Sequence, residues 1–99
     1  MIVSDLVRQE VEKRFSTDAA SVIESLGATP LAFLDVPDRA RERDRVHLAI
    51  VKLSGGDISQ LPKILDYARR DWRDVLVWSG LGQPNWPDVL RDAGFPVPE

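Results

Sequence analysis

The sequence predicts an all-α fold, a compact bundle or array of about five to seven helices joined by short loops. Apolar residues recur at the three- and four-residue spacing of amphipathic helices along most of the chain. Proline, glycine, aspartate and asparagine, which favour helix ends, separate these stretches. No run alternates apolar and polar residues between turns, so no strand is expected. With 99 residues the chain has the length of one domain, residues 1–99.

The first third of the chain predicts two helices and a turn. The first helix covers residues 4–15, and Ser16 or Thr17 then serves as the N-cap of the second. Gly27 is expected to end the second helix, because glycine adopts the left-handed conformation at little steric cost. Thr29-Pro30 predicts a short helical turn that reaches Leu34. One face of the first helix carries the apolar residues Val3, Leu6, Val7, Val11 and Phe15.

Two segments share a pattern that suits helix starts. Asp35 to Asp38 and Asn85 to Asp88 both read Asx-x-Pro-Asp. The Asx side chain can accept a free backbone N–H, and proline sits in the first turn, where no N–H is needed. They predict helices over about residues 36–54 and 86–93. The longer helix is apolar on most sides, as expected of a central helix.

Residues 53–57 read L-S-G-G-D, which resembles the L-S-G-G-Q signature of ABC-type ATPases except at one position. The chain has no P-loop motif, and the carboxylate of Asp57 would repel an anion at the start of the next helix. We therefore interpret the segment as a junction in which Gly55 or Gly56 has positive φ, Asp57 caps the next helix and no phosphate binds. Pro62 indicates that this helix is irregular or begins later than Asp57 suggests.

Further caps are expected toward the C-terminus. The helix after the junction extends to about residue 71, and Asp71 or Asp74 caps a short helix that Ser79-Gly80 ends. Gly94 is expected to end the last helix, with Phe95 folded back onto the core.

Composition narrows the classes of function. The formal net charge is -3, from 13 basic and 16 acidic residues, so no overall field favours nucleic acid or an anionic membrane. The chain has no cysteine and one histidine, His47, so it has no thiol nucleophile and no Cys/His metal cluster. We expect no catalysis, metal or cofactor. No stretch reaches the roughly 18 apolar residues of a membrane span. Charges interrupt the N-terminal stretch from Asp5 onward, so a cytoplasmic protein without membrane contact is expected.

The central helix carries a candidate basic surface. Arg41, Arg45 and Lys52 fall on the side opposite Val46 and Leu53, and their spacing predicts a thin, outward-facing basic stripe.

Tryptophans supply the other candidate surface. Aromatic residues concentrate in the last third of the chain, where Trp72 and Trp86 are expected to pack short helices onto the body. A tryptophan that stays exposed would mark an interaction surface, because tryptophan is enriched among interface hot spots. Trp86, beside the L-G-Q-P loop, is the first candidate, and Trp72 is the second.

Residues 45–59, R-V-H-L-A-I-V-K-L-S-G-G-D-I-S, and residues 66–80, D-Y-A-R-R-D-W-R-D-V-L-V-W-S-G, resemble segments of a group of short, uncharacterised, all-helical bacterial proteins. The resemblance implies a small helical protein of bacterial origin. It implies no activity, and no functional residue carries over from it.

These features favour a small, non-catalytic helical domain that acts through protein contacts. Its partner is an unidentified protein or a second copy of the chain in a homodimer. The alternative is an accessory nucleic-acid-binding module that uses the stripe of Arg41, Arg45 and Lys52. Three positive charges release few counterions from a phosphate backbone, so the protein-contact hypothesis is preferred.

Overall fold

The computed structural model describes residues 2–33 and 36–99. These residues contain no strand, which confirms the prediction of an all-α fold. Two short 3₁₀ turns, η1 (Ser16–Asp18) and η2 (Ile58–Gln60), lie between helices. The α-helices are α1 (Asp5–Phe15), α2 (Ala19–Ala28), α3 (Arg39–Ser54), α4 (Leu61–Arg70), α5 (Trp72–Ser79) and α6 (Trp86–Asp92).

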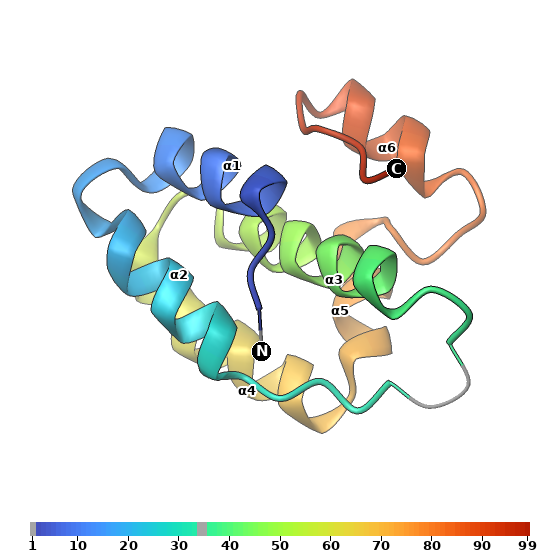
Figure 1. Cartoon of the computed structure of the whole chain (residues 1–99), viewed down its shortest axis with the longest axis horizontal. Coiled ribbons are helices and arrows are strands. Elements are labelled where there is room, and N and C mark those ends of the chain that lie inside the picture. The colour runs from blue at the N-terminus through green and yellow to red at the C-terminus, as the bar shows by residue number, and fades with distance from the viewer. Residues whose placement is uncertain (1, 34–35) are drawn as a thin grey trace.

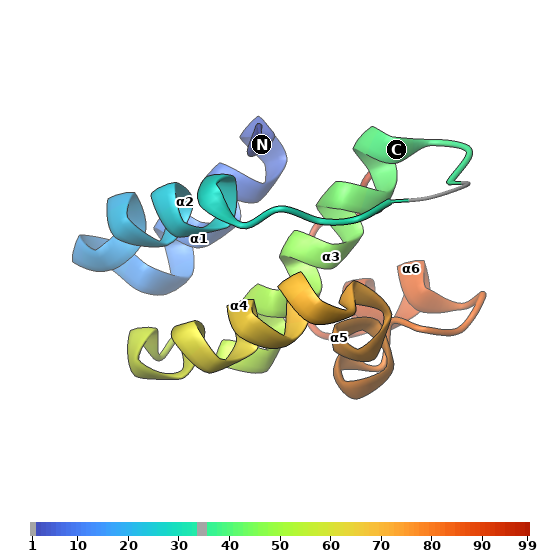
Figure 2. The ribbon, with the colours of Figure 1, turned by 90° about the horizontal axis from the view of Figure 1, so that it is seen from below.

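Helix α3 is the centre of the molecule, as the sequence predicts. It packs against α1, α4 and α5, and every residue from 46 to 51 is buried. Figure 1 shows α3 running alongside α1, and Figure 2 shows it passing between the α1–α2 hairpin and the α4–α5 pair. The fold measures 35 × 28 × 22 Å, with a radius of gyration of 12.1 Å. The apolar residues on all sides of α3 therefore pack against helices that surround it.

The turn between α1 and α2 differs from the predicted cap. Ser16 has φ of +49° and ends α1, with its N–H donating to the carbonyl oxygen of Glu12. Helix α2 begins at Ala19 after η1, and its N-terminus has no side-chain capping bond. The prediction that Ser16 or Thr17 caps α2 is wrong, because both residues belong to the 3₁₀ turn that reverses the chain.

The end of α2 and the segment after it also differ from the prediction. Gly27 lies inside α2, which continues to Ala28. Thr29 closes the last turn instead, since its hydroxyl donates to the carbonyl oxygen of Ser25 at 2.8 Å. Residues 30–33 form no helix, so the predicted turn after Pro30 is wrong there. Leu34 lies outside the described residues.

Helix α3 begins at Arg39, three residues later than predicted, because Asp38 is its N-cap. The Asp38 carboxylate accepts the N–H of Arg41 at 3.0 Å. Asp35, the cap expected from the sequence, lies outside the described residues.

The L-S-G-G-D junction has the predicted backbone. Gly55 and Gly56 have φ of +60° and +79°. Asp57 accepts the N–H of Ser59 at 2.9 Å, so it caps η2 and not α4 directly. Pro62 is the second residue of α4, where no N–H is needed. The helix therefore begins later than Asp57, as the proline indicates.

The C-terminal helices begin and end close to the predicted residues. Asp71 caps α5 by accepting the N–H of Arg73 at 3.1 Å, and Gly80, with φ of +82°, ends it. Helix α6 begins at Trp86 as predicted, although the Asn85 side chain makes no capping bond.

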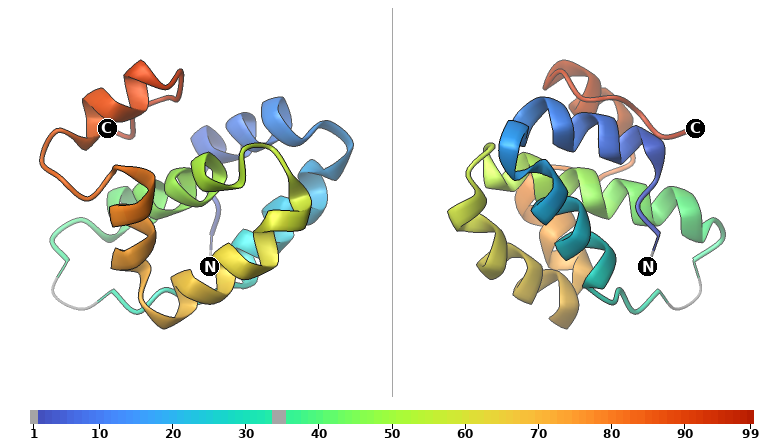
Figure 3. Two further views of the ribbon diagram at one scale, coloured as in Figure 1. Left: turned by 180° about the vertical axis from the view of Figure 1, so that it is seen from behind. Right: turned by 60° about the vertical axis from the view of Figure 1, so that its left-hand side comes forward.

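The chain then folds back after α6. Gly94 has φ of +81°, and the N–H of Phe95 donates to the carbonyl oxygen of Leu90 at 2.9 Å. The buried ring of Phe95 lies 3.8 Å below the guanidinium of Arg14, which brings the C-terminal tail to α1 (Figure 3). Within the described ranges no helix is both long and apolar enough to cross a membrane.

Candidate interaction surface

Trp86 is part of the core, as expected if it packs its helix onto the body, so it is not the exposed tryptophan that would mark an interaction surface. It is only 6% exposed. The guanidinium groups of Arg41 and Arg45 lie over its ring, 4.5 and 4.9 Å from the centroid. Two arginines of α3 thus cover the first residue of α6, and cation–π attraction adds to the burial of the ring.

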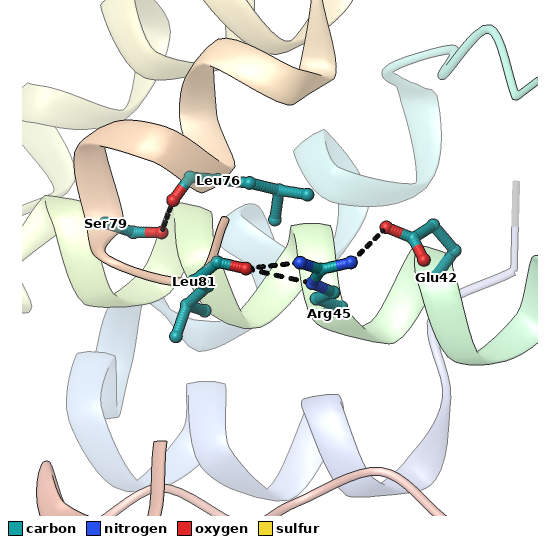
Figure 4. A network of polar contacts seen from close by, with 5 residues as sticks. All are labelled: Glu42, Arg45, Leu76, Ser79 and Leu81. Carbon is teal, nitrogen blue, oxygen red and sulfur yellow. Dashed lines mark hydrogen bonds and ion pairs between the residues drawn. The ribbon is translucent and has the colours of Figure 1, made fainter. Parts of the chain in front are cut away.

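Arg45 and Lys52 do not form an outward-facing stripe. Arg45 Nε and Nη2 donate to the carbonyl oxygen of Leu81 at 3.0 and 2.5 Å, and Nη1 pairs with Glu42 at 3.0 Å (Figure 4). Lys52 Nζ donates to the carbonyl oxygen of Ser79 at 2.8 Å. The end of a helix leaves carbonyl groups without intrahelical partners, and cations are favourable there. Arg45 and Lys52 instead fasten the end of α5 and the loop after it to α3.

Trp72 is half-buried and holds the segment that precedes α3. Its Nε1 donates to the carbonyl oxygen of Ala32 at 3.0 Å. Its ring packs edge-on against Phe33, with centroids 5.0 Å apart. These contacts join residues 32–33 to the corner between α4 and α5.

The exposed tryptophan is Trp78, on the outer face of α5. Trp78 is 52% exposed and its neighbour Val77 is 67% exposed. The Trp78 ring packs edge-on against Tyr67 of α4, with centroids 4.8 Å apart and planes at 82°. Trp78 is not among the candidates expected from the sequence, although the sequence contains a signal for this surface. Residues 75–78 are four consecutive apolar residues, and a helix that buries one side must expose some of them.

Val77 forms the edge of an open groove beside α5. The groove has a volume of about 400 Å³. Apolar side chains and the Glu42–Arg45 ion pair both line it. Its lining includes Val36, Pro37, Trp72, Arg73, Leu76 and Val77.

A second hollow, of about 220 Å³, lies at the corner where α4 meets α5. It is lined by Ala32, Arg69, Arg70, Asp71, Trp72 and Arg73. The three arginine side chains are 61%, 71% and 72% exposed in that order.

Two aspartates hold the arginines of this hollow in place. Arg69 and Arg70 pair with the two carboxylate oxygens of Asp66 at 2.5 and 3.0 Å. Arg73 Nε donates to Asp71 at 3.0 Å. Hydrogen bonds from the Arg73 side chain and backbone lower the pKa of Asp71, so its carboxylate stays charged.

His47 lies away from these surfaces and is 1% exposed. Both ring nitrogens are buried without a hydrogen-bond partner. Burial, reinforced by the charge of Arg43, lowers the pKa of His47 to about 4. The imidazole is therefore neutral at pH 7 and inaccessible to a substrate. Among the described residues, no group of three or more His, Asp or Glu side chains is placed to hold a metal ion.

Comparison of the chain with protein-family models, with curated proteins and with solved structures found no match. The resemblance of residues 45–59 and 66–80 to short bacterial proteins therefore stays a prediction, as do the bacterial origin and the cytoplasmic location.

Proposed function

We propose that the protein is a non-catalytic interaction domain that contacts another protein through the outer face of α5. The observation that carries this proposal is the exposure of Trp78 next to Val77, at 52% and 67%. Adjacent large apolar side chains on a surface are typical of contact sites, and tryptophan is the residue most enriched among hot spots.

The contact of Trp78 with Tyr67 adds support. The edge-on packing at 4.8 Å restrains the indole ring before any partner arrives. A restrained side chain loses less conformational entropy on binding, so more of its contact energy contributes to affinity. Trp78 is thus a preorganised anchor on α5, next in sequence to Val77, which lines the groove.

The nucleic-acid alternative has less support. Arg45 and Lys52 already donate to the carbonyl oxygens of Leu81 and Ser79. Arg41 lies over the ring of Trp86. A phosphate backbone would have to compete with these contacts, and three charges would release few counterions.

Site-specific photo-crosslinking tests the proposal. A benzophenone amino acid is placed at Val77, and as a matched control at Ile2, which is 73% exposed. The N-terminal segment and α5 lie on opposite sides of α3 in Figure 2. We expect protein adducts in host cells from position 77 and not from position 2. Mass spectrometry of the adduct then separates a homodimer from a complex with a different protein.

The yield of the crosslinked product from position 77 should depend on Trp78. Trp78→Ala is expected to reduce the yield from position 77 by about 30-fold, since hot-spot truncations cost about 2 kcal/mol or more. Equal yields from the two positions, or a yield that Trp78→Ala leaves unchanged, would contradict a contact through α5.

A further inference from the structure

The chain after Leu81 forms a C-terminal arm, residues 82–99, that lies at the edge of the fold (Figure 1). Its first four residues, 82–85, are all exposed and join the buried Leu81 to α6. Beyond them the arm buries three large apolar side chains, those of Trp86, Leu90 and Phe95. The arm is thus an exposed connection followed by a segment that packs onto the body of the protein.

The hydrogen bonds of the arm stay within the arm. The N–H of Phe95 donates to the carbonyl oxygen of Leu90, and Arg91 pairs with Asp88. Across residues 2–33 and 36–99, no hydrogen bond or ion pair joins the arm to the preceding chain. Moving the arm away from the body would therefore leave no buried hydrogen-bonding group without its partner.

Side-chain packing alone holds the arm on α1 and α3. The guanidinium of Arg14 lies 3.8 Å from the ring centroid of Phe95. Those of Arg41 and Arg45 lie 4.5 and 4.9 Å from the ring centroid of Trp86. Cation–π and apolar contacts are short in range, so a small outward movement of the arm breaks all of them together.

Helix α6 depends on these contacts for its own stability. It has seven residues, and the side chain of Asn85 makes no capping bond at its start. Isolated helices shorter than about 12 residues are marginal in water, so α6 should unfold when it leaves the body. Packing and helix formation in the arm are therefore coupled.

We propose that the C-terminal arm opens and closes as one unit over α1 and α3, while the chain before it stays folded. Opening uncovers the side chains of Arg14 and Arg41, which lie over the two rings when the arm is closed. The protein then presents a second surface, separate from the outer face of α5. This inference goes beyond the proposed function and does not depend on it.

The boundary of the arm follows from the contacts at the end of α5. Arg45 donates to the carbonyl oxygen of Leu81, and Lys52 donates to that of Ser79. Both acceptors precede the exposed residues 82–85, so these hydrogen bonds remain when the arm opens. The outer face of α5 is therefore the same in the open and closed forms.

Hydrogen exchange of the native full chain, measured by NMR, tests the inference. Protection of N–H groups in the arm, such as those of Ala93 and Phe95, is compared with protection of those in α3 and α5 at low urea concentrations. We expect protection in the arm to be at least tenfold lower than in α3. It should also depend less on urea, because opening the arm exposes less surface than unfolding the whole chain.

Two variants should act on different parts of the chain. Phe95→Leu loses the ring beneath Arg14 and should speed exchange in the arm about tenfold, with no change in α3 or α5. Val22→Ala, at a fully buried position of α2, should speed exchange in α3 about 30-fold and leave the arm unchanged. The matched control is Arg91→Gln, whose guanidinium is 64% exposed and pairs within the arm, and it should change neither.

The results distinguish a separate arm from a single cooperative unit. Equal protection of the arm and α3 in the natural chain, or equal responses of both to Phe95→Leu, would overturn the inference. Faster exchange of α5 together with the arm in that variant would also overturn it, because the boundary would then not lie at Leu81. Crosslinking from position 77 does not depend on these results, so the contact through α5 is supported or contradicted separately.

Discussion

Arg45 of α3 donates two hydrogen bonds to the main-chain carbonyl oxygen of Leu81, from Nε at 3.0 Å and from Nη2 at 2.5 Å. Leu81 is fully buried and is the second residue after α5 ends. The same guanidinium lies over Trp86, at the start of α6. One side chain therefore fixes the loop between α5 and α6 relative to the central helix.

Replacement of Arg45 should lower stability much more than replacement of an exposed arginine. Arg45→Met keeps most of the apolar stem but removes the donors, so we expect the free energy of unfolding to fall by about 2 to 3 kcal/mol. Arg91→Met, the exposed control, should change it by less than about 0.5 kcal/mol. Urea denaturation measures both. Equal losses would show that the Leu81 contact contributes no more than a surface ion pair.

The sequence predicts features that depend on neighbouring residues. Asp71, Gly55, Gly80 and Gly94 act within a few positions of themselves, through a cap or a left-handed backbone. Their roles are visible in the sequence because the partner atoms are local. Gly27 is the exception, since Thr29 supplies a local alternative that ends the helix two residues after Gly27.

The sequence does not predict which exposed-looking residues are covered by distant elements. Arg45 and Leu81 are 36 positions apart, and no local pattern shows that the loop after α5 returns to α3. For that reason the sequence pattern predicts that Arg45 faces solvent and makes Trp86 the first candidate for an exposed tryptophan. In the structure Trp86 is buried beneath Arg45, whose own side chain is mostly covered. Trp78 becomes the exposed aromatic because α5 turns its other side to α3.

Alanine variants of Gly55 and Gly56 at the junction separate the cost of a steric clash from the cost of the left-handed backbone. A Cβ at Gly56 would lie 3.2 Å from the backbone carbonyl oxygen of Arg14, whereas a Cβ at Gly55 would meet nothing within 4 Å. Both residues have positive φ, so each alanine variant pays about 1 kcal/mol for that conformation. Gly56→Ala should cost more than Gly55→Ala, by about 1 kcal/mol, in thermal or urea unfolding. Equal costs would contradict close packing of the junction against α1.

Trp86 and Trp78 should respond differently to truncation. Trp86→Ala removes a core ring and should cost about 3 to 5 kcal/mol. Trp78→Ala removes an exposed ring and its edge-on contact with Tyr67, so it should cost about 1 kcal/mol. Urea unfolding of the two variants measures this difference. A large loss for Trp78→Ala would mean that the ring supports the fold, and its use as an interface probe would fail.

The buried imidazole of His47 should make the protein sensitive to mild acid. Burial lowers its pKa from 6.5 to about 4 in the folded state, so the unfolded chain binds a proton at a higher pH than the folded chain does. The resulting contribution to stability is complete above pH 6.5 and is lost as pH falls toward 4. At about pH 5 the loss should be about 2 kcal/mol. Burial raises the pKa of Asp44, which has the opposite effect, since the folded state then binds a proton more readily than the unfolded chain does.

His47→Leu should remove this acid sensitivity. The variant replaces two buried nitrogens that have no hydrogen-bond partner with an apolar side chain, so at pH 7 it should be at least as stable as the natural chain. Between about pH 7 and pH 5 its free energy of unfolding should change about 2 kcal/mol less than that of the natural chain. Urea titrations at several pH values measure how the free energy of unfolding changes with pH in each of the two proteins. If the free energy of unfolding changed equally with pH in both proteins, His47 would already be protonated in the folded protein, or other groups would control the acid response.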